Sequence, residues 1–224
     1  MIPDGASQAV AVFAQTFGCG NDLADVLVAK GRTRAWPPRA TIVESLGANT
    51  AVFLMIDGHA HALALSVDGR LVLVETFGKG AIFGEASLIG DSRSEHEVAA
   101  VDHVQASQFA AQTFVALMEN YSCIALTMSR VLTARLQETT RQMVEIATLS
   151  APGRIHAELL RQARATPGMA ITPAPVLSEF ALTVRSTRET VSRTISLLEK
   201  RGIIRRDKNA LTIVAPHRLE ELVY

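Results

Sequence analysis

The sequence predicts a mixed α+β protein in which an antiparallel β-barrel or roll precedes a long helix and a compact helical domain. Short apolar runs separated by Asp-Gly pairs fill residues 41–107, a pattern typical of antiparallel strands. Residues 113–149 contain neither Pro nor Gly, so one long helix can form there. Apolar residues at three- and four-residue steps between Pro175 and Leu198 predict two further helices joined by a turn. The domains are therefore expected at residues 1–110, 111–150 and 151–224.

The composition is that of a globular protein without a membrane span. Hydrophobic residues make up 48% of the 224 positions and charged residues 20%. No apolar run approaches the roughly 20 residues that cross a bilayer. Residues 1–18 lack a basic segment ahead of their apolar residues, so they make a poor secretory signal. We expect a cytoplasmic protein with no membrane partner.

Net charge is zero overall but differs between the two parts of the chain. Residues 151–224 hold twelve Lys or Arg and seven Asp or Glu, a net charge of +5. Residues 1–150 hold ten and fifteen, a net charge of −5. The C-terminal part is therefore the one suited to a polyanion, since neutralising phosphates supplies much of the affinity of proteins for DNA.

Two cysteines, Cys19 and Cys123, are too far apart in sequence to form a CxxC pair, and they fit neither an iron–sulfur pattern nor a disulfide framework. We favour buried, unreactive thiols. A redox-sensing role for either thiol stays open.

A short helix is predicted over residues 21–30. Leu23, Val26 and Leu27 fall on one side of it, and Asn21 or Asp22 can cap its start.

The strands are expected in the apolar runs that follow Trp36-Pro37-Pro38. Asp57-Gly58 and Asp68-Gly69 separate these runs and are hairpin turn signals. Strands at this spacing predict a compact antiparallel barrel or roll. The runs cover residues 51–56, 61–67 and 71–77.

His59 and His61 fall on one face of a predicted strand and suggest a metal site of the kind that cupin enzymes carry. Such a site requires a Glu a few residues later and a further His, and residues 62–66 supply no carboxylate. We therefore favour ordinary exposed histidines and predict no metal. His96 and His103 are also expected at the surface, although the sequence leaves an axial haem ligand open.

The long helix carries two apolar faces. One is a seam of heptad type that begins at Ser129, and the other includes Leu117, Ile124 and Val131 and can pack on the roll. A core helix of a monomer needs only one such face, so the second favours contact with another copy of the chain. The seam residues expected at that interface are Leu132, Leu136, Thr139, Met143 and Ile146.

The two helices between Pro175 and Leu198 each have one apolar face. Ser186 or Thr187 can cap the second helix, and Glu189 suits the positive end of its dipole. The apolar positions are Val176, Leu177, Phe180, Ala181 and Val184 in the first helix and Val191, Ile195 and Leu198 in the second.

Arg188, Glu189, Ser192 and Arg193 remain on the outward side of the second helix, and we call this set the reading face. The Arg fork matches O6 and N7 of guanine, Glu can accept from N4 of cytosine, and Ser can do either. The reading face thus has the chemistry of a DNA base reader, although a solvated charged face shows the same pattern.

The segment from Thr187 to Ile204 reads TRETVSRTISLLEKRGII and resembles the recognition helix and following turn of the bacterial CRP/FNR regulators. The resemblance implies base contacts by Arg188, Glu189 and Arg193, with Thr187 and Ser192 in the same DNA-binding set. It also implies a β-roll sensory domain, a dimerisation helix and a winged helix-turn-helix domain within the three boundaries given above. The chain departs from the family at Arg185, which stands in the turn where the family usually has Gly. Gly adopts a positive φ freely and Arg only at a cost, so we expect a strained or slightly different turn.

A second resemblance lies in the segment GKGAIFGEASLIG, residues 78–90, which is similar to the phosphate-binding cassette of that family. Gly84 and Glu85 match its Gly-Glu pair, of which Glu takes the ribose hydroxyl. The Arg-Ser pair that would bind the cyclic phosphate falls on Ser94 and Glu95. Arg93 could replace that Arg only after a one-residue shift, which in a strand turns the side chain to the opposite face. A carboxylate repels phosphate, so we expect a degenerate pocket that does not bind cyclic AMP in the usual manner. No cofactor is assigned, and a cyclic nucleotide or haem is not excluded.

The last part of the chain predicts a basic wing. Pro152-Gly153 is expected to end the long helix as a hinge, and residues 164–175 to form a loop. Gly202 should terminate the second helix, and residues 203–214 should form a hairpin that turns at residues 207–209. Lys200, Arg205 and Arg206 are assigned to phosphate contacts, with exposed solubility charges as the alternative.

These observations predict a homodimeric regulator of transcription that binds double-stranded DNA at an inverted repeat and works with RNA polymerase. The resemblance implies a half-site containing TGA or a close relative. No nucleotide-binding loop, nucleophile motif or complete metal set appears, so we predict no enzyme. Three alternatives stay open: a regulator that responds to a cyclic nucleotide, another small molecule or haem; a ligand-binding module whose DNA-binding domain has lost its activity; and a cupin-like metal enzyme.

Overall fold

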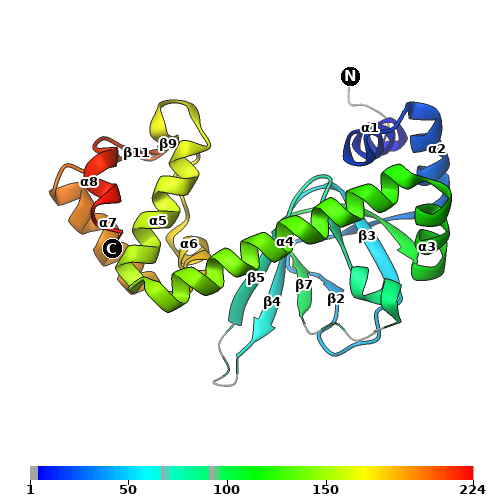
Figure 1. Cartoon of the computed structure of the whole chain (residues 1–224), viewed down its shortest axis with the longest axis horizontal. Coiled ribbons are helices and arrows are strands. Elements are labelled where there is room, and N and C mark those ends of the chain that lie inside the picture. The colour runs from blue at the N-terminus through cyan, green and yellow to red at the C-terminus, as the bar shows by residue number, and fades with distance from the viewer. Residues whose placement is uncertain (1–4, 67–68, 70, 91–93, 95, 224) are drawn as a thin grey trace. The chain divides into compact units, whose positions relative to one another are not determined.

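The computed structural model describes residues 5–66, 69, 71–90, 94 and 96–223, and Figure 1 shows the path of the chain. The chain divides into two compact units, residues 1–135 and 136–224, so that the long helix α4 (Ser122–Thr148) contributes to both. Within the described part of the chain, no helix combines the length and the apolar character needed to cross a membrane.

The N-terminal unit is built on two antiparallel sheets of four strands, in the orders β1-β8-β3-β6 and β2-β7-β4-β5. This is the antiparallel roll that the sequence predicts, and the three apolar runs correspond to β3, β4 and β5. The strands are β1 (Arg32–Trp36), β2 (Thr41–Val43), β3 (Ala51–Asp57), β4 (Ala60–Leu65), β5 (Leu71–Phe77), β6 (Ile82–Phe83), β7 (Glu97–Ala100) and β8 (Val104–Ala110).

The two Asp-Gly pairs lie in different kinds of connection. β4 pairs with β5 from Ala60 opposite Phe77 onward, so Gly69 lies in a hairpin turn as predicted, and Asp68 lies outside the described residues. β3 and β4 belong to different sheets, so the hairpin expected at Asp57-Gly58 is wrong. Gly58 instead turns the chain from one sheet to the other with φ +84°. A Cβ at Gly58 would lie 2.2 Å from a backbone oxygen, so only Gly fits there.

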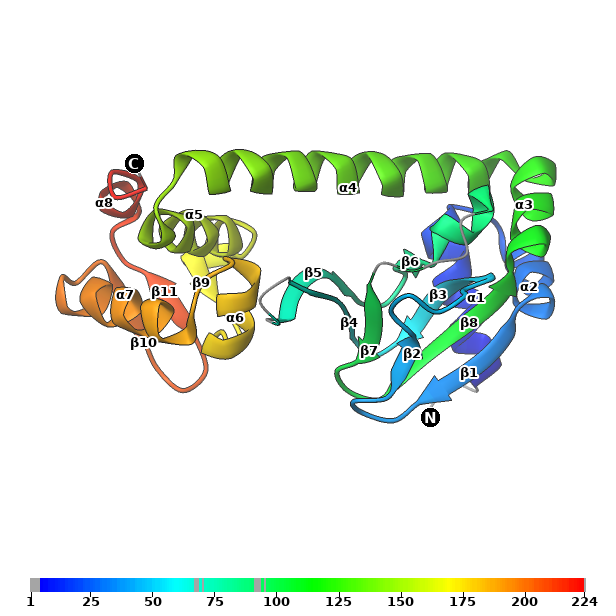
Figure 2. The same ribbon diagram turned by 90° about the horizontal axis from the view of Figure 1, so that it is seen from below.

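Helices α1 (Gly5–Phe17), α2 (Asn21–Lys30) and α3 (Ala111–Asn120) gather beside the roll, as the views in Figures 1 and 2 agree. They share an apolar core with β3, β8 and the first part of α4. Phe13, Phe109 and Ile124 lie at its centre and are no more than 1% exposed. Neither α1 nor β1 is predicted from the sequence; β1 is exposed along four of its five residues and has no alternating apolar pattern.

Helix α2 has the predicted bounds but a different cap and a different buried face. Gly20 occupies the N-cap position, in place of Asn21 or Asp22. Ala24 and Leu27 are the buried residues. Val26, which was expected beside Leu27, is 41% exposed.

The single helix expected over residues 113–149 is in fact two helices, α3 and α4. Tyr121 separates them because it takes an extended conformation with φ −130° and ψ 99°. Its side chain packs against the core of α1, α2 and the roll, so tertiary packing interrupts the helix where no Pro or Gly does. Leu117 and Ile124 are buried in that core, as predicted for the roll-facing side.

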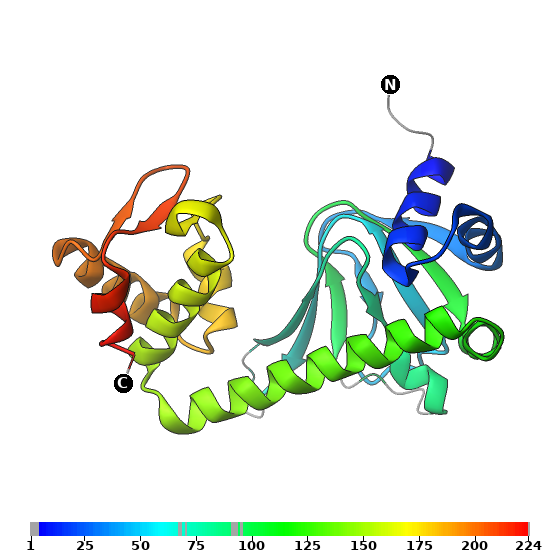
Figure 3. The same cartoon turned by 45° about the horizontal axis from the view of Figure 1, so that its top comes forward.

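The C-terminal unit consists of the end of α4, α6 (Leu177–Thr183), three further helices and a small sheet. These helices are α5 (Ala151–Arg164), α7 (Arg188–Lys200) and α8 (Pro216–Glu220). The sheet has the order β10-β11-β9, with β10 (Ile204–Arg206) and β11 (Leu211–Ile213) forming the predicted hairpin, drawn in orange-red in Figure 3. The expected loop over residues 164–175 contains η2 (Pro167–Met169) and β9 (Ala170–Ile171), which pairs with β11.

Pro152 and Gly153 begin α5, so the prediction that they end the long helix as a hinge is wrong. α4 ends at Thr148, and Ser150 caps α5 by accepting a hydrogen bond from the Gly153 N–H at 3.1 Å. Pro suits the first turn of a helix because its missing N–H has no partner there in any case. The connection between the two helices is therefore only Leu149 and Ser150.

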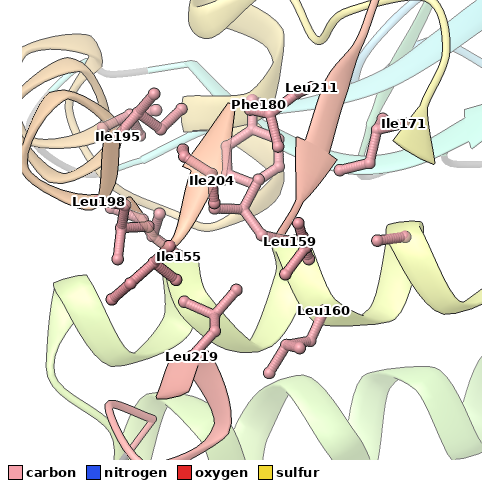
Figure 4. Packing of buried hydrophobic residues seen from close by; sticks show 14 of the residues in the cluster. Ile155, Leu159, Leu160, Ile171, Phe180, Ile195, Leu198, Ile204, Leu211 and Leu219 are labelled. Atoms are coloured by element: carbon pink, nitrogen blue, oxygen red, sulfur yellow. The ribbon is translucent and has the colours of Figure 1, made fainter. Parts of the chain in front are cut away.

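The C-terminal unit, which we call the winged unit after its β10–β11 hairpin, has a core of its own, seen from close by in Figure 4. Both predicted apolar faces contribute to it, with the exception of Val176, which is 56% exposed. Side chains from α5, α6, α7, α8 and the hairpin meet there, among them Ile155, Leu159, Phe180, Ile195, Leu198, Ile204, Leu211 and Leu219.

Two adjacent leucines of α7 test this core. Leu198 is 1% exposed, so Leu198→Ala should lower the free energy of unfolding by about 2–5 kcal/mol, because it removes buried methyl groups and leaves a cavity. Leu197 is 48% exposed, and Leu197→Ala should change that free energy by about 0.5 kcal/mol or less. Denaturant titration of the full chain followed by circular dichroism measures both; equal losses would contradict this packing.

Candidate DNA-reading surface and effector pocket

Helix α7 is fixed at its start by a side-chain cap and along one side by the core. Thr187 is the N-cap residue, and its Oγ1 accepts a hydrogen bond from the Thr190 N–H at 3.2 Å. Val191, Ile195 and Leu198 are buried, as predicted. Gly202, with φ +65°, follows the end of the helix in the expected position. The outward side of α7 is thus determined by which residues the core requires.

The reading face is exposed. Arg188, Glu189 and Arg193 all point to solvent, and Ser192 beside them is half-buried. Arg193 forms an ion pair with Glu189 one turn earlier, and these side chains are 77% and 70% exposed. An ion pair as exposed as this contributes about 0–1 kcal/mol, so contacts to another molecule can replace it at little cost.

The turn between α6 and α7 contains the residue that departs from the family pattern. Arg185 has φ +50°, in the left-handed region that Gly adopts freely. Its Nη2 donates to Gln142 Oε1 of α4 at 2.9 Å. Arg154 of α5 holds the same turn, since it donates to the backbone oxygens of Val184 and Arg185 at 3.1 and 3.2 Å.

The wing brings further positive charge close to α7. Asp207 Oδ1 accepts the Asn209 and Ala210 N–H groups, which closes the predicted turn and lowers the pKa of the Asp207 carboxyl. Arg205 and Arg206 are consecutive in β10, so their side chains leave the strand on opposite faces. Arg206 lies 3.4 Å from Glu199 of α7, and Lys200 at the end of α7 is exposed.

In the N-terminal unit, Gly84 and Glu85 begin the short helix η1 (Glu85–Ile89). Gly84 has φ +86°, and a Cβ there would lie 2.4 Å from the Ala51 oxygen, so the position requires Gly. Ser87 Oγ donates to the Gly84 oxygen at 2.7 Å and stabilises the turn.

Glu85 is already paired with Arg135 of α4, a residue that was not predicted from the sequence. Arg135 Nη1 donates to Glu85 Oε1 at 2.6 Å and its Nε donates to Glu75 Oε1 at 2.8 Å. Its Nη2 donates to the Ile82 oxygen, and its Cζ lies 5.5 Å from the centre of the Phe77 ring. Burial raises the pKa of the Glu75 carboxyl, although Arg135 acts in the opposite direction.

The two positions that match the Arg-Ser pair supply no described cation. Ser94 Oγ donates to the His96 oxygen at 2.6 Å, and its own backbone oxygen accepts from Leu46 N at 2.7 Å. Glu95 lies outside the described residues.

The predicted seam on α4 is largely uncovered in the single chain. Every one of its members is exposed, including Thr139. The exposed fractions are 47% for Leu132, 68% for Leu136, 65% for Met143 and 44% for Ile146.

The histidines and cysteines have ordinary surroundings. His59 Nδ1 lies 2.7 Å from Asp102 Oδ2, and this contact lowers the pKa of the Asp102 carboxyl. No group of three His, Cys, Asp or Glu side chains able to hold a metal occurs among the described residues. Cys19 and Cys123 are free and half-buried, and burial raises the pKa of the Cys19 thiol.

The structure thus places most of the predicted residues in three regions: the reading face and the wing, the turn at Gly84 and Glu85, and the α4 seam. Three residues important to these places were missed, namely Arg135, Arg154 and Gln142. A lone Arg between two apolar seam positions, Leu132 and Leu136, was the one available signal for Arg135. Nothing local in the sequence relates Arg154 or Gln142 to a turn more than 30 residues away.

Comparison with known proteins agrees with this organisation. Residues 33–121 match the family model of the cyclic nucleotide-binding domain, and residues 153–222 match that of the Crp-like helix-turn-helix domain. The chain is 27% identical over 175 residues to the cAMP-activated global transcriptional regulator CRP of Pasteurella multocida, covering 75% of this chain and 83% of that protein.

Two further relatives extend the comparison. The cAMP-activated global transcriptional regulator Vfr of Pseudomonas aeruginosa is 26% identical over 188 residues, 80% of this chain and 88% of Vfr. The solved structure of a CooA mutant from Carboxydothermus hydrogenoformans has the same fold, with a TM-score of 0.79, 18% identity and coverage of 89% of this chain and 90% of CooA. The two domain matches in their order along the chain, together with the CRP and Vfr relatives, establish that the protein belongs to the CRP/FNR family of DNA-binding transcription regulators.

Proposed function

We propose that this regulator binds an inverted-repeat DNA site as a homodimer, with the reading face of α7 in the major groove. The observation that carries the proposal is the exposure of Arg188, Glu189 and Arg193 on one side of a capped helix whose other side is buried. These groups can hydrogen-bond to guanine and cytosine edges. The first turns of α7 then lie nearest the bases, with Thr187 and Ser192 in the same contact set.

Phosphate contacts are assigned to Lys200, Arg205 and Arg206. The C-terminal residues 151–224 carry twelve basic and seven acidic residues, a net charge of +5, which favours a polyanion. Arg205 is the better placed of the two wing arginines, because Arg206 already pairs with Glu199. Such contacts position the protein on the duplex, and the base contacts specify the sequence.

The dimer is proposed to form along α4. Its exposed seam residues recur at three- and four-residue steps, which is the pattern of a two-helix seam; they are Leu132, Leu136, Thr139, Met143 and Ile146. A two-fold dimer presents two reading faces about one DNA turn, roughly 34 Å, apart, so the operator is an inverted repeat. The division into residues 1–110, 111–150 and 151–224 then corresponds to sensor, dimerisation helix and DNA-binding domain, and RNA polymerase is the protein partner.

The pocket beside Glu85 is proposed to be degenerate toward cyclic AMP. The carboxylate that would meet a ribose is paired with Arg135, and Glu75 shares the same guanidinium. Among the described residues, two carboxylates therefore share one guanidinium there. Ser94 adds no positive charge to compensate, so a cyclic phosphate meets repulsion.

A regulator activated by a cyclic nucleotide is the second candidate, since both curated relatives carry that activator in their names. The family relationship also supports a regulator rather than a cupin-like enzyme.

Arg193→Ala tests the reading face. The change should weaken binding to an operator selected from random duplexes by about 1–3 kcal/mol and relax the preference at one base pair, because one bidentate base contact is lost. Gel-shift titration of the operator and of its single-base variants measures both effects.

Arg205→Ala is the matched control for that experiment. It should weaken binding to all sequences alike and reduce the slope of log K against log salt by about 1, since it removes one phosphate contact. An Arg193→Ala protein that binds its operator as tightly as the wild type would remove Arg193 from the reading face.

Leu136→Glu tests the seam. Two carboxylates placed opposite each other in an apolar interface should convert the dimer to a monomer at micromolar concentration. Sedimentation velocity measures the mass, with Gln137→Glu, one residue away and off the seam, as the control that keeps the dimer. A wild-type monomer under the same conditions would contradict the proposal.

Isothermal calorimetry with cyclic AMP tests the pocket. No saturable heat is expected for the wild type at micromolar ligand, whereas Ser94→Arg, which supplies a guanidinium at the aligned position, should gain binding. Micromolar affinity in the wild type would show that the pocket is intact and would favour the second candidate.

A further inference from the structure

We infer that Arg185 is a positioning residue for DNA recognition, which links the turn of the helix-turn-helix to the end of α4 and so fixes the direction of the reading face. The inference rests on the proposed function, since it explains how the two reading faces of a dimer are held at one spacing. We call the contacts of Arg185 and Arg154 around this turn the arginine link.

The backbone at Arg185 is the first observation. Its φ of +50° is a conformation that L-residues adopt only with steric crowding, whereas Gly adopts it freely. Arg185 is one of the few non-Gly residues of the described chain with a positive φ. The side chain therefore has to contribute something that Gly cannot.

The contacts of the side chain are the second observation. Arg185 Nη2 donates to Gln142 Oε1 at 2.9 Å, across 43 residues of sequence and onto the last part of α4. Gln142 is itself held in place, because its Nε2 donates to Glu138 Oε1 at 2.8 Å. The Gln142 amide thus joins the turn on one side to the charged side chains of α4 on the other.

Those charged side chains are ordered as a group. Arg141 lies between Glu138 and Glu145 and pairs with both. The hydrogen bonds from Arg141 lower the pKa of the Glu138 carboxyl to about 2, so this acceptor for Gln142 stays ionised in neutral solution.

Arg154 of α5 forms the second part of the arginine link. It donates through Nε to the Val184 oxygen at 3.1 Å and through Nη2 to the Arg185 oxygen at 3.2 Å. Its Nη1 donates to the Leu149 oxygen, just past the end of α4, at 3.1 Å. Two arginines therefore tie one turn to Gln142 of α4 and to Leu149 just after it, seven residues of sequence apart.

Fold stability does not account for Arg185. Its contact with Gln142 is solvent-exposed, and an exposed contact to a flexible side chain adds little to stability. A role in fixing the direction of the reading face explains Arg185 better, because its partner Gln142 directly precedes the seam residue Met143. In a dimer that meets along this seam, the arginine link connects the interface to the start of α7 through one turn.

The direction of the reading face can be tested through the spacing between the two half-sites that the dimer prefers. A duplex selected with the wild-type protein is compared with the same duplex carrying one extra base pair at its centre. Loss of the arginine link should reduce affinity for the original duplex several-fold and reduce the penalty for the inserted base pair, because each reading face gains angular freedom.

The variants are Arg185→Gly, Gln142→Ala and the combination of the two. Each single variant should show the same loss, and the double variant no greater loss, because both residues act through one contact. Arg185→Gly should melt at or above the wild-type temperature, since it relieves the backbone. Hydrogen exchange of the amides in residues 142–149 should rise several-fold in either single variant without DNA.

Three results would overturn the inference while leaving the proposed function in place. The first is Gln142→Ala behaving as wild type while Arg185→Gly loses affinity with a smaller salt slope, which would make Arg185 a phosphate contact. The second is unchanged affinity and spacing preference in every variant. The third is unchanged exchange over residues 142–149. Failure of the wild type to retain any duplex would instead refute the proposed function.

Discussion

Burial of one side of α7 is the constraint on which the proposed activity depends. Val191, Ile195 and Leu198 fill the core of the winged unit, and this packing leaves a single orientation for the rest of the helix. Arg188 and Arg193 point outward because the core takes the other side of the helix, and the ion pair of Arg193 with Glu189 is itself exposed. Their own partners are weak, so recognition can use a surface that folding has already arranged.

The charged groups around Glu85 differ from those of the reading face, since Glu85 and Glu75 are already paired with Arg135 within the chain. Arg135 is shared between two carboxylates, a backbone oxygen and an aromatic ring. Any anionic effector has to compete with these contacts for one guanidinium. Because Arg135 lies on α4, such competition also acts on the helix that carries the proposed dimer seam.

The sequence predicted well where short-range patterns determine structure. The apolar steps of α7, its Thr187 cap and Gly202 are all local signals, and all are confirmed. Predictions failed where distant packing decides. Tyr121 interrupts the helix in a stretch without Pro or Gly, and its half-buried side chain packs against the core. Asp57-Gly58 has the composition of a hairpin, yet the chain changes sheet there, which only the pairing of the strands reveals.

The brevity of the joint between α4 and α5 has a mechanical consequence. Leu149 and Ser150 alone separate the two helices, and the Ser150 hydroxyl is bound to the first turn of α5. With two soft torsions per residue, roughly four rotations describe the whole joint. So short a joint leaves few ways for α5 to change its direction relative to the end of α4.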